Sequence, residues 1–403
     1  MRDAPMRETL RVAFTGALAA VDLTARVARA MPATPRGVRR GLLLAVGKAS
    51  PAMARGALPA VDARIARALV VAPDGTEAEL DDPRVELMRA SHPDPDARSV
   101  AAGRRAMELV RQSDYVIALV SGGASSLICL PRGVSLARYV RVVRALLLGG
   151  ATAREVNLVR RHLCAVKGGG LARRAAGPVR TLIASDVIRG EAQDVGSGPT
   201  APDPTTCAQA RAVLRRHAPR LALPPLHESL KPTSAAARGL RVRFVARPQD
   251  LARALAGELQ ARLDSVRVLE ASVAPADVLA REYLARAQTL RPGQALVRSA
   301  EPSLVVDASP AGRGGRSTHL ATLVARHLPQ GVIFLAGASD GVDGNSGSAG
   351  AVVDATLLAR VGEEAIARAL AAFDTGRLLA SAGMTVTLGP TGSNLADVHV
   401  LAR

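Results

Sequence analysis

The feature that most constrains the fold is an alternation of short apolar segments with longer amphipathic segments rich in arginine and alanine, along almost the whole chain. Short apolar runs are typical of buried strands, and the amphipathic runs between them are typical of helices that cover a sheet. The alternation therefore predicts parallel sheets with helices on both faces. The expected strands cover residues 41–46, 68–71, 115–120, 180–185, 242–246, 303–308, 331–336 and 384–388. The expected helices cover residues 6–31, 97–112, 136–148, 153–175, 206–217, 249–261, 275–289, 318–327 and 361–373.

Two proline-rich stretches, residues 199–206 and 224–233, interrupt this pattern before a new series of strands and helices begins near Val242. A chain of 403 residues is long enough for two or three domains. We therefore expect an α/β protein with two Rossmann-like parallel-sheet domains and an inter-domain cleft. The N-terminal domain is expected over residues 1–240 and the C-terminal domain over residues 241–403.

The net charge and the aromatic content of the chain indicate which classes of partner it can bind. Its net charge of +18 favours nucleic acid, but the arginines are spread along the sequence, and aromatic residues, which stack on bases, make up only 2%. No run of about 18 apolar residues is present, and charged residues occupy the N-terminus, where a signal peptide has its apolar segment. We expect a cytoplasmic protein without a nucleic-acid or membrane partner, and the sequence leaves its oligomeric state open, a homodimer included.

The three cysteines, Cys129, Cys164 and Cys207, are scattered. No C-x-x-C pair occurs, and no histidine stands at ligand spacing from a cysteine, so the sequence predicts neither a disulfide framework nor a zinc site. The cysteines are expected to be small buried hydrophobic residues.

Candidate ligand contacts lie in polar loops that follow the expected strands, at the edge of a parallel sheet where ligands bind. In LLLAVGKAS, a strand ends at Gly47 and delivers Lys48 to that edge, where an ammonium group can reach phosphate oxygens. The alternative is a solvated lysine at the start of a helix, because the full G-x-x-x-x-G-K-[ST] motif is absent.

In VSGGASSL, the chain leaves a strand through Gly122 and Gly123 and enters a helix, which exposes backbone N–H groups suited to an anion. A nucleophilic serine on a strained elbow is disfavoured, since neither Ser125 nor Ser126 has glycines two positions away on both sides.

Further loops repeat this composition. ASHPDPD offers His92, although a turn with a helix cap explains it nearly as well. In NLVRRHLCAVKGGGLA, Lys167 precedes three glycines that let backbone or ligand approach, whereas His162 is more consistent with a structural role. PAGRGGRS provides glycines and two arginines for an anion. Asp186, Asp340 and Asp343 follow strands and suit Mg²⁺, with helix capping as the alternative.

With these loops assembled, the chain resembles the glycerate 2-kinase family, which has an N-terminal kinase domain and a C-terminal MOFRL domain and is also labelled hydroxypyruvate reductase. The resemblance covers nearly the whole chain, through VGKASPAM, SHPDPD, SGGASSL, NLVRRHLCAVKGGGLA, SDV, SGPTAPDPTT, EPS, GRGGR, SDGVDG and GPTGSN in the family's order. It implies ATP- and Mg²⁺-dependent phosphorylation of D-glycerate, or a closely related hydroxy acid, at the 2-hydroxyl, in a cleft between two α/β domains. The family's motif lysine maps to Lys48 and its motif arginine to Arg316.

The sequence departs from the family after SDV, where Ile188-Arg189-Gly190-Glu191 replaces P-G-D-D, and after GRGGR, where Ser317-Thr318-His319 replaces N-Q-E. Three functions therefore stay open: a kinase of glycerate or a related hydroxy acid, a hydroxypyruvate reductase, and a non-catalytic binding protein. The reductase lacks a G-x-G-x-x-G motif with a carboxylate about 20 residues on. The expected catalytic residues are Lys48 and Arg316, and the expected metal ligands are Asp186, Asp340 and Asp343. Substrate or nucleotide contacts are expected from Gly47, His92, Ser121, Gly122, Gly123, Ser125, Lys167, Ser197, Gly198, Arg313, Gly314, Gly315, Gly392 and Asn394.

Overall fold

The computed structural model describes residues 3–76, 79–306 and 311–403. The chain divides into two compact units. The N-terminal unit comprises residues 23–246, and the C-terminal unit comprises residues 1–22 together with residues 247–403.

The N-terminal unit is built on a six-stranded sheet in the order β3-β2-β1-β4-β5-β6, in which every neighbouring pair is parallel. From β1 the chain builds outward to β3 and then returns to place β4 on the other side of β1. The carboxyl ends of β1 and β4 therefore flank the topological switch point, where open α/β sheets bind ligands. The strands are β1 (Gly41–Val46), β2 (Ile65–Pro73), β3 (Val85–Ala90), β4 (Tyr115–Ser121), β5 (Val179–Ala184) and β6 (Arg241–Ala246).

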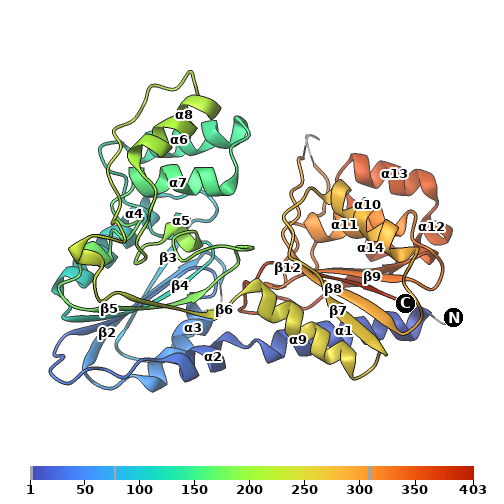
Figure 1. The fold of residues 1–403 in the computed structure, drawn as a ribbon, viewed down its shortest axis with the longest axis horizontal. Helices are drawn as coiled ribbons and strands as arrows, with labels where there is room; N and C mark the ends of the chain where they lie inside the picture. Colours follow the sequence, from blue (N-terminus) through green and yellow to red (C-terminus); the bar gives the residue numbers. More distant parts are fainter. Residues whose placement is uncertain (1–2, 77–78, 307–310) are drawn as a thin grey trace. The chain divides into compact units, whose positions relative to one another are not determined.

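Helices cover both faces of this sheet, as the continuous apolar strands require: every residue of β1 and β4 is buried. Helices α2 (Leu23–Ala30) and α3 (Ser50–Ala57) lie on one face, and the other helices of the unit lie on the opposite side (Figure 1). These are α4 (Ala97–Gln112), α5 (Ala124–Leu127), α6 (Leu136–Leu148), α7 (Ala153–Leu163) and α8 (Cys207–His217).

The C-terminal unit has a second six-stranded sheet in the order β11-β10-β9-β12-β8-β7. Strand β7 pairs with β8 in parallel, whereas β12 and β10 are antiparallel to their neighbours, so four strands run one way and two run the other. The α/β class is confirmed, and this sheet is mixed where a fully parallel one was expected. The strands are β7 (Ser265–Val268), β8 (Gln294–Ala300), β9 (Ile333–Ala338), β10 (Gly350–Asp354), β11 (Thr385–Val386) and β12 (Asp397–Ala402).

Helices α1 (Asp3–Ala20) and α9 (Pro248–Gln260) cover one face of the second sheet, and the other helices of this unit cover the opposite face (Figure 1). These are α10 (Ala276–Ala287), α11 (Arg316–Ala325), α12 (Thr356–Val361), α13 (Glu363–Ala371) and α14 (Thr375–Ser381).

The division of the chain differs from the expected boundary at residues 240 and 241 in two ways. Strand β6 completes the N-terminal sheet by pairing with β5, and helix α1 packs on the C-terminal sheet. In α1, Phe14 lies where a side chain on Gly337 would stand, and Arg7 pairs with Asp354 at 3.3 Å. An amphipathic helix needs an apolar surface, but its sequence does not specify which sheet supplies that surface.

The elements match the sequence expectations unevenly. The prediction misses β3, β7, β8, β10 and β12, because their residues are half-exposed, as in β3, or include buried polar side chains, as in β12. The strand expected at residues 303–308 is wrong over 303–306, where Ser303 forms only an isolated bridge, and residues 307 and 308 lie outside the described residues. The helix expected over 6–31 is divided between α1 and α2, and the one expected over 153–175 ends at Leu163.

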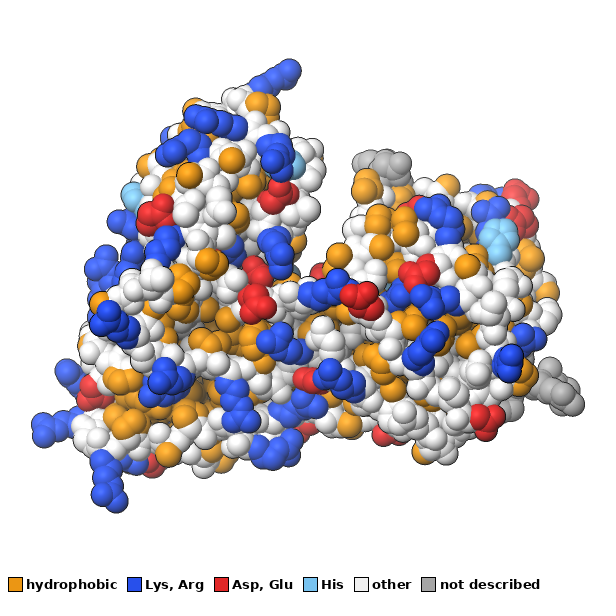
Figure 2. Space-filling view, viewed as in Figure 1, with side chains coloured by type: hydrophobic (Ala, Val, Ile, Leu, Met, Phe, Trp, Pro, Cys, Tyr) orange, Lys and Arg blue, Asp and Glu red, His pale blue; other side chains and the backbone are white. Residues whose placement is uncertain are grey.

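Charge is dispersed over the surface. On the face drawn in Figure 2, Lys and Arg side chains are scattered over both units and interspersed with acidic side chains. Within the described ranges, no helix has the length and hydropathy needed to cross a bilayer.

Candidate active site

The turn after β1 is held tightly against the end of β4. A Cβ atom on Gly47, whose φ is +128°, would lie 2.1 Å from Ser121 Oγ, so only glycine fits there. The backbone N–H of Lys48 donates to the carbonyl of Gly122 at 2.8 Å, and Ser121 Oγ accepts from the N–H of Ala49 at 3.1 Å. Ser121 is buried and closes this turn, and Lys48 is thereby fixed at the switch point of the sheet.

Three strand ends converge at Gly123. A Cβ atom on this glycine, whose φ is +82°, would lie 3.1 Å from Lys48 Cγ and 3.2 Å from His92 Cδ2. Lys48 is half-buried and His92, which follows β3, is exposed. The structure thus brings Lys48, His92 and Gly123 together, around a backbone that lacks a side chain and can be approached closely by a ligand.

Beside Gly123, the short helix α5 carries Ser125, whose Oγ accepts from Nη1 of Arg160 at 3.1 Å. Arg160 lies on α7 and was not predicted. The two residues that follow it, Arg161 and His162, are buried, and the Arg161 guanidinium pairs with Asp203 at 3.1 Å. Lys48 and Arg160 are therefore two basic groups close to the Gly123 turn and α5.

Lys167, Ser197 and Gly198 lie in the interior of the N-terminal unit. Lys167 is 2% exposed, and its Nζ donates to the carbonyl of Ile128 at 2.8 Å. The loop that contains it is joined to the Ser197 loop by backbone hydrogen bonds, with Gly168 N donating to Ser197 O at 3.0 Å and Gly169 N donating to Gly198 O at 2.7 Å. The Lys167 loop thus supports the end of α5 through Ile128, and the ligand contacts expected of these three residues stay a prediction.

In the C-terminal unit, Arg316 begins α11 and lies between two carboxylates. Its Nη1 is 3.1 Å from Glu301 Oε1, and its Nη2 is 3.4 Å from Asp397 Oδ1. The Arg316 side chain is 41% exposed. Burial lowers the pKa of Arg316, but Asp397 and Glu301 reverse this effect and leave that pKa above its usual value. The two carboxylates therefore orient a guanidinium that is charged and accessible.

Asp397 is the most perturbed acidic group of this cluster. It is 3% exposed, and its Oδ2 has no hydrogen-bond partner among the described residues. Burial raises the pKa of Asp397 to about 7, against the opposing effect of Arg316. Sequence reasoning missed Asp397, which begins β12, and also gave Glu301 no role.

The predicted metal ligands have different surroundings. Both Asp343 oxygens accept backbone N–H groups at the start of α11, from Ser317 at 2.9 Å and Thr318 at 2.8 Å, so this carboxylate caps the helix. Asp340 is half-buried and accepts from the N–H of Val342 at 3.1 Å. Asp186 is half-buried and follows β5. Of the three carboxylates, Asp343 fits a metal least.

The GRGGR loop uses its backbone N–H groups for its own structure. Arg313 N donates to Asp374 Oδ1 at 2.7 Å, Gly314 N donates to Asn345 Oδ1 at 2.7 Å, and Gly315 N donates to Thr318 Oγ1 at 2.9 Å. The expected nest of amides for an anion is therefore already occupied by protein groups. The groups of this loop that remain available to bind an anion are its two arginine side chains, of which Arg313 is more exposed than Arg316.

The turn that contains Gly392 and Asn394 lies against the start of the Asp340 loop. Thr391 N donates to the carbonyl of Asp340 at 3.2 Å, and Leu395 N donates to Ser339 Oγ at 2.7 Å. Gly392 is exposed and Asn394 is buried. The structure thus brings Gly392 and Asp340 to the same edge of the second sheet.

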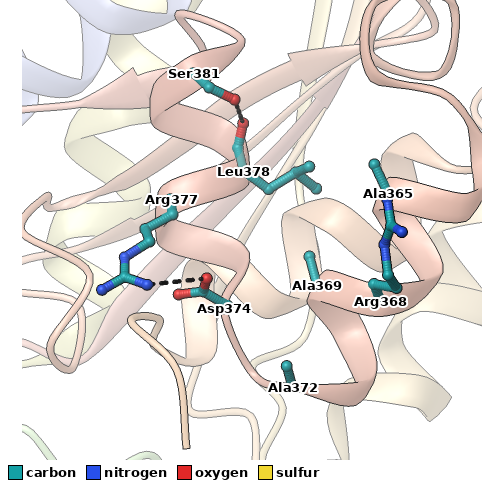
Figure 3. A pocket seen from close by; sticks show the side chains of 8 residues that line it. All are labelled: Ala365, Arg368, Ala369, Ala372, Asp374, Arg377, Leu378 and Ser381. Carbon is teal, nitrogen blue, oxygen red and sulfur yellow. Dashed lines mark hydrogen bonds and ion pairs between the residues drawn. The ribbon is translucent and has the colours of Figure 1, made fainter.

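A surface depression of about 430 Å³ lies between α13 and α14 (Figure 3). None of its lining residues belongs to the predicted site, and Figure 3 shows Asp374 in it paired with Arg377. This depression is therefore separate from the Arg316 cluster. It is lined by Ala365, Arg368, Ala369, Ala372, Asp374, Arg377, Leu378 and Ser381.

Known proteins with similar sequences and folds share this two-part organisation. Residues 9–230 match the domain of unknown function DUF4147, and residues 294–397 match the MOFRL family. A D-glycerate 2-kinase of Thermotoga maritima is 34% identical over 90% of each chain. A chain of Agrobacterium vitis that carries a hydroxypyruvate reductase name is 35% identical over 99% of this chain and 95% of that relative.

The fold agrees with these sequence matches. The crystal structure of a glycerate kinase from Thermotoga maritima matches with a TM-score of 0.83 at 28% sequence identity, over 99% of both chains. The DUF4147 match alone spans more than half of the sequence. The chain therefore belongs to the family in which a DUF4147 domain is followed by a MOFRL domain, together with the D-glycerate 2-kinase of Thermotoga maritima.

Proposed function

We propose that the protein is a glycerate 2-kinase, which transfers the terminal phosphoryl group of ATP to the 2-hydroxyl of D-glycerate and yields 2-phosphoglycerate and ADP. The observation that carries this proposal is the position of Lys48, fixed at the switch point of the parallel sheet beside Gly123 and His92. The family membership supports the same reaction, since relatives of similar length are named glycerate 2-kinases.

Lys48 has the chemistry that phosphoryl transfer requires. The transferring group spreads negative charge over its oxygens in a loose transition state, and positioned cations stabilise that charge. Lys48 provides a compact ammonium, and the Gly122-Gly123 backbone leaves room for phosphate oxygens beside it. We assign Lys48 to the transferring phosphoryl group and His92 to the edge of the same site.

Arg316 has the chemistry to bind the carboxylate of the acid or the transferring phosphate. A guanidinium donates two parallel hydrogen bonds to an oxyanion, which fixes orientation as well as charge. Glu301 and Asp397 act as positioning residues, because each bonds one terminal nitrogen of Arg316 and limits the directions in which the remaining N–H groups point. That Lys48 and Arg316 act on the same pair of substrates across an inter-domain cleft stays a prediction, as does a homodimer.

We propose Mg²⁺ as the metal, since it binds through one or two carboxylates together with phosphate oxygens. Asp186 and Asp340 fit this role as half-buried carboxylates that follow strands, whereas Asp343 is used to cap α11. When bound, Mg²⁺ would neutralise charge on the ATP phosphates.

A reductase is the second candidate, because two relatives from Agrobacterium vitis carry that name and the first sheet has the strand order of dinucleotide-binding folds. Its recognition residues are missing. The turn after β1 holds Lys48 in place of a glycine-rich motif, and Asp74, the carboxylate that follows β2, is bound by both terminal nitrogens of Arg98 at 2.6 and 2.7 Å. These observations favour phosphate over nicotinamide chemistry.

A parallel assay tests the proposal and separates the three functions. The protein is incubated with Mg-ATP and a panel of hydroxy acids while ADP release is followed, and with NADH and hydroxypyruvate while NADH oxidation is followed. We expect D-glycerate-dependent ADP release, lost by orders of magnitude in Lys48→Met and partly retained in Lys48→Arg, because a missing cation typically costs several kcal/mol. ADP release that is unchanged in Lys48→Met would remove Lys48 from the mechanism, and NADH oxidation alone would establish the reductase.

A further inference from the structure

We propose that His162, Cys207 and Glu228 form a zinc site in the N-terminal unit, outside the residues assigned to phosphoryl transfer. His162 lies on α7, Cys207 begins α8, and Glu228 lies in the segment that follows α8. One ligand atom from each residue lies within 4.8 Å of the other two. The residues are far apart in the sequence, which is why spacing rules do not find this cluster.

The donor atoms suit zinc in kind, and the histidine and cysteine atoms also suit it in separation. Sulfur and imidazole nitrogen are preferred zinc ligands, with bonds of about 2.3 and 2.0–2.1 Å, so a tetrahedral centre separates the two atoms by about 3.5 Å. His162 Nδ1 lies 3.5 Å from Cys207 Sγ. A carboxylate completes a mixed ligand set that zinc accepts and that magnesium, which prefers oxygen alone, does not.

The residues around His162 provide an acceptor for its Nε2 proton in the metal-bound state. The hydroxyl of Thr205 lies 2.8 Å from both oxygens of Asp203 and 3.2 Å from His162 Nε2, so its proton belongs to the shorter contact with Asp203. In the metal-free protein the proton of His162 belongs on Nδ1, which donates to the carbonyl oxygen of His227 at 2.9 Å. When a metal ion takes Nδ1, the ring proton moves to Nε2, and Nε2 then donates to Thr205. This is the outer-shell arrangement by which carboxylates orient metal-binding histidines, with a threonine hydroxyl between them.

The ion would take the place of the Nδ1 proton. A zinc ion bound to Nδ1, Cys207 Sγ and a Glu228 oxygen would replace the hydrogen bond from Nδ1 to the carbonyl oxygen of His227, and water would supply the fourth ligand. Binding releases the thiol proton of Cys207 to solvent.

The residues around Glu228 hold its carboxylate in place, and solvent can reach the site from the side of Glu228. Glu228 Oε1 accepts from the backbone N–H of Cys207 at 2.9 Å, and Oε2 pairs with Lys231 Nζ at 2.7 Å, so the ion competes with that ammonium for the carboxylate. His162 is 1% exposed, Cys207 is half-buried and Glu228 is exposed. The site is therefore closed on the histidine side and open on the carboxylate side.

The consequence of binding is structural. The ion would join α7, the start of α8 and the segment around Glu228, and that segment also donates from Leu230 N to the carbonyl of Gly168 at 2.8 Å. Zinc would thus hold the glycine loop that supports α5, without touching a substrate. Binding should therefore raise the melting temperature of the protein.

Cobalt substitution tests the site. The full chain is freed of metal with a chelator and titrated with Co²⁺ as the probe, and Zn²⁺ is then added to displace it. We expect one Co²⁺ per chain, visible bands of a tetrahedral centre, and a thiolate-to-cobalt charge-transfer band. The charge-transfer band should disappear in Cys207→Ser, with affinity for Zn²⁺ reduced by more than 100-fold, since even outer-shell changes cost about 10–100-fold.

Matched variants separate this site from adventitious binding. Cys129→Ala and Glu364→Gln should keep full uptake, because Cys129 is buried elsewhere and Glu364 is an exposed residue of α13. Thr205→Val should weaken binding by about 10–100-fold and leave the charge-transfer band in place. Absence of stoichiometric uptake by the folded wild-type chain, or a charge-transfer band that survives in Cys207→Ser, would overturn the proposal.

Discussion

The carboxyl of Asp397 should make the protein less stable as the pH rises from about 5 to 8. Burial raises the pKa of this group to about 7 in the folded protein, whereas an unfolded chain has an aspartate pKa of about 3.9. Between these values the folded state holds a proton that the unfolded state has lost, so the free energy of unfolding falls with rising pH. A shift of about three units corresponds to about 4 kcal/mol, of which about 3 kcal/mol is lost between pH 5 and pH 8.

The substitution Asp397→Asn isolates this effect, because the amide is neutral at every pH while it keeps the size of the side chain. Relative to wild type, the free energy of unfolding of the variant should rise by about 3 kcal/mol from pH 5 to pH 8. Urea unfolding followed by far-ultraviolet circular dichroism measures this difference, since the chain contains no tryptophan for fluorescence.

Asp277→Asn provides the matched control, because Asp277 lies on the surface of α10 with 58% of its side chain exposed. This variant should show no pH-dependent difference from wild type of comparable size. A difference between Asp397→Asn and wild type that is the same at both pH values would refute the argument that burial penalises the ionised Asp397 carboxyl.

Three further results are expected. Gly123→Ala should reduce kcat at least about tenfold and lower the free energy of unfolding by about 1 kcal/mol. The reason is that the added Cβ would lie 3.1 Å from Lys48 Cγ and 3.2 Å from His92 Cδ2, on a backbone with a left-handed conformation. Normal steady-state kinetics of this variant would contradict the prediction. Arg316→Lys should raise KM for the acid or lower kcat by about 10- to 100-fold, with ATP binding little changed. Arg313→Lys in the same loop should change these two constants less. Equal effects of the two substitutions would argue against the role of Arg316. Chelation of Mg²⁺ should abolish turnover, and Asp340→Asn should raise the Mg²⁺ concentration needed for half-maximal rate; activity in excess EDTA would exclude the metal.

Sequence reasoning predicted that Lys48 and Gly123 lie close together, because parallel strands deliver their carboxyl ends to one edge. Lys48 and Gly123 each follow a continuous apolar strand, so the switch-point rule places them together without knowledge of side-chain contacts. His92 was expected among the same contacts on the composition of its loop alone, because β3, the strand that it follows, is half-exposed and was not expected.

Residues whose role depends on distant contacts were harder to predict. A ligand contact was expected of Lys167 because three glycines follow it, but its ammonium is buried against the carbonyl of Ile128, 39 residues earlier. Asp397 begins the strand that inserts between β8 and β9, and this antiparallel pairing was not visible in a pattern that favoured parallel strands. Glu301 meets Arg316 through the same sheet geometry.

Product analysis tests the central claim most directly. The full chain is incubated with Mg-ATP and D-glycerate, and the phosphorylated product is identified by ³¹P NMR against authentic 2- and 3-phosphoglycerate. The account predicts 2-phosphoglycerate formed in equal amount to ADP, and none with Lys48→Met. Formation of 3-phosphoglycerate would contradict the proposed acceptor hydroxyl, and ADP formation independent of every hydroxy acid supplied would contradict the proposed kinase.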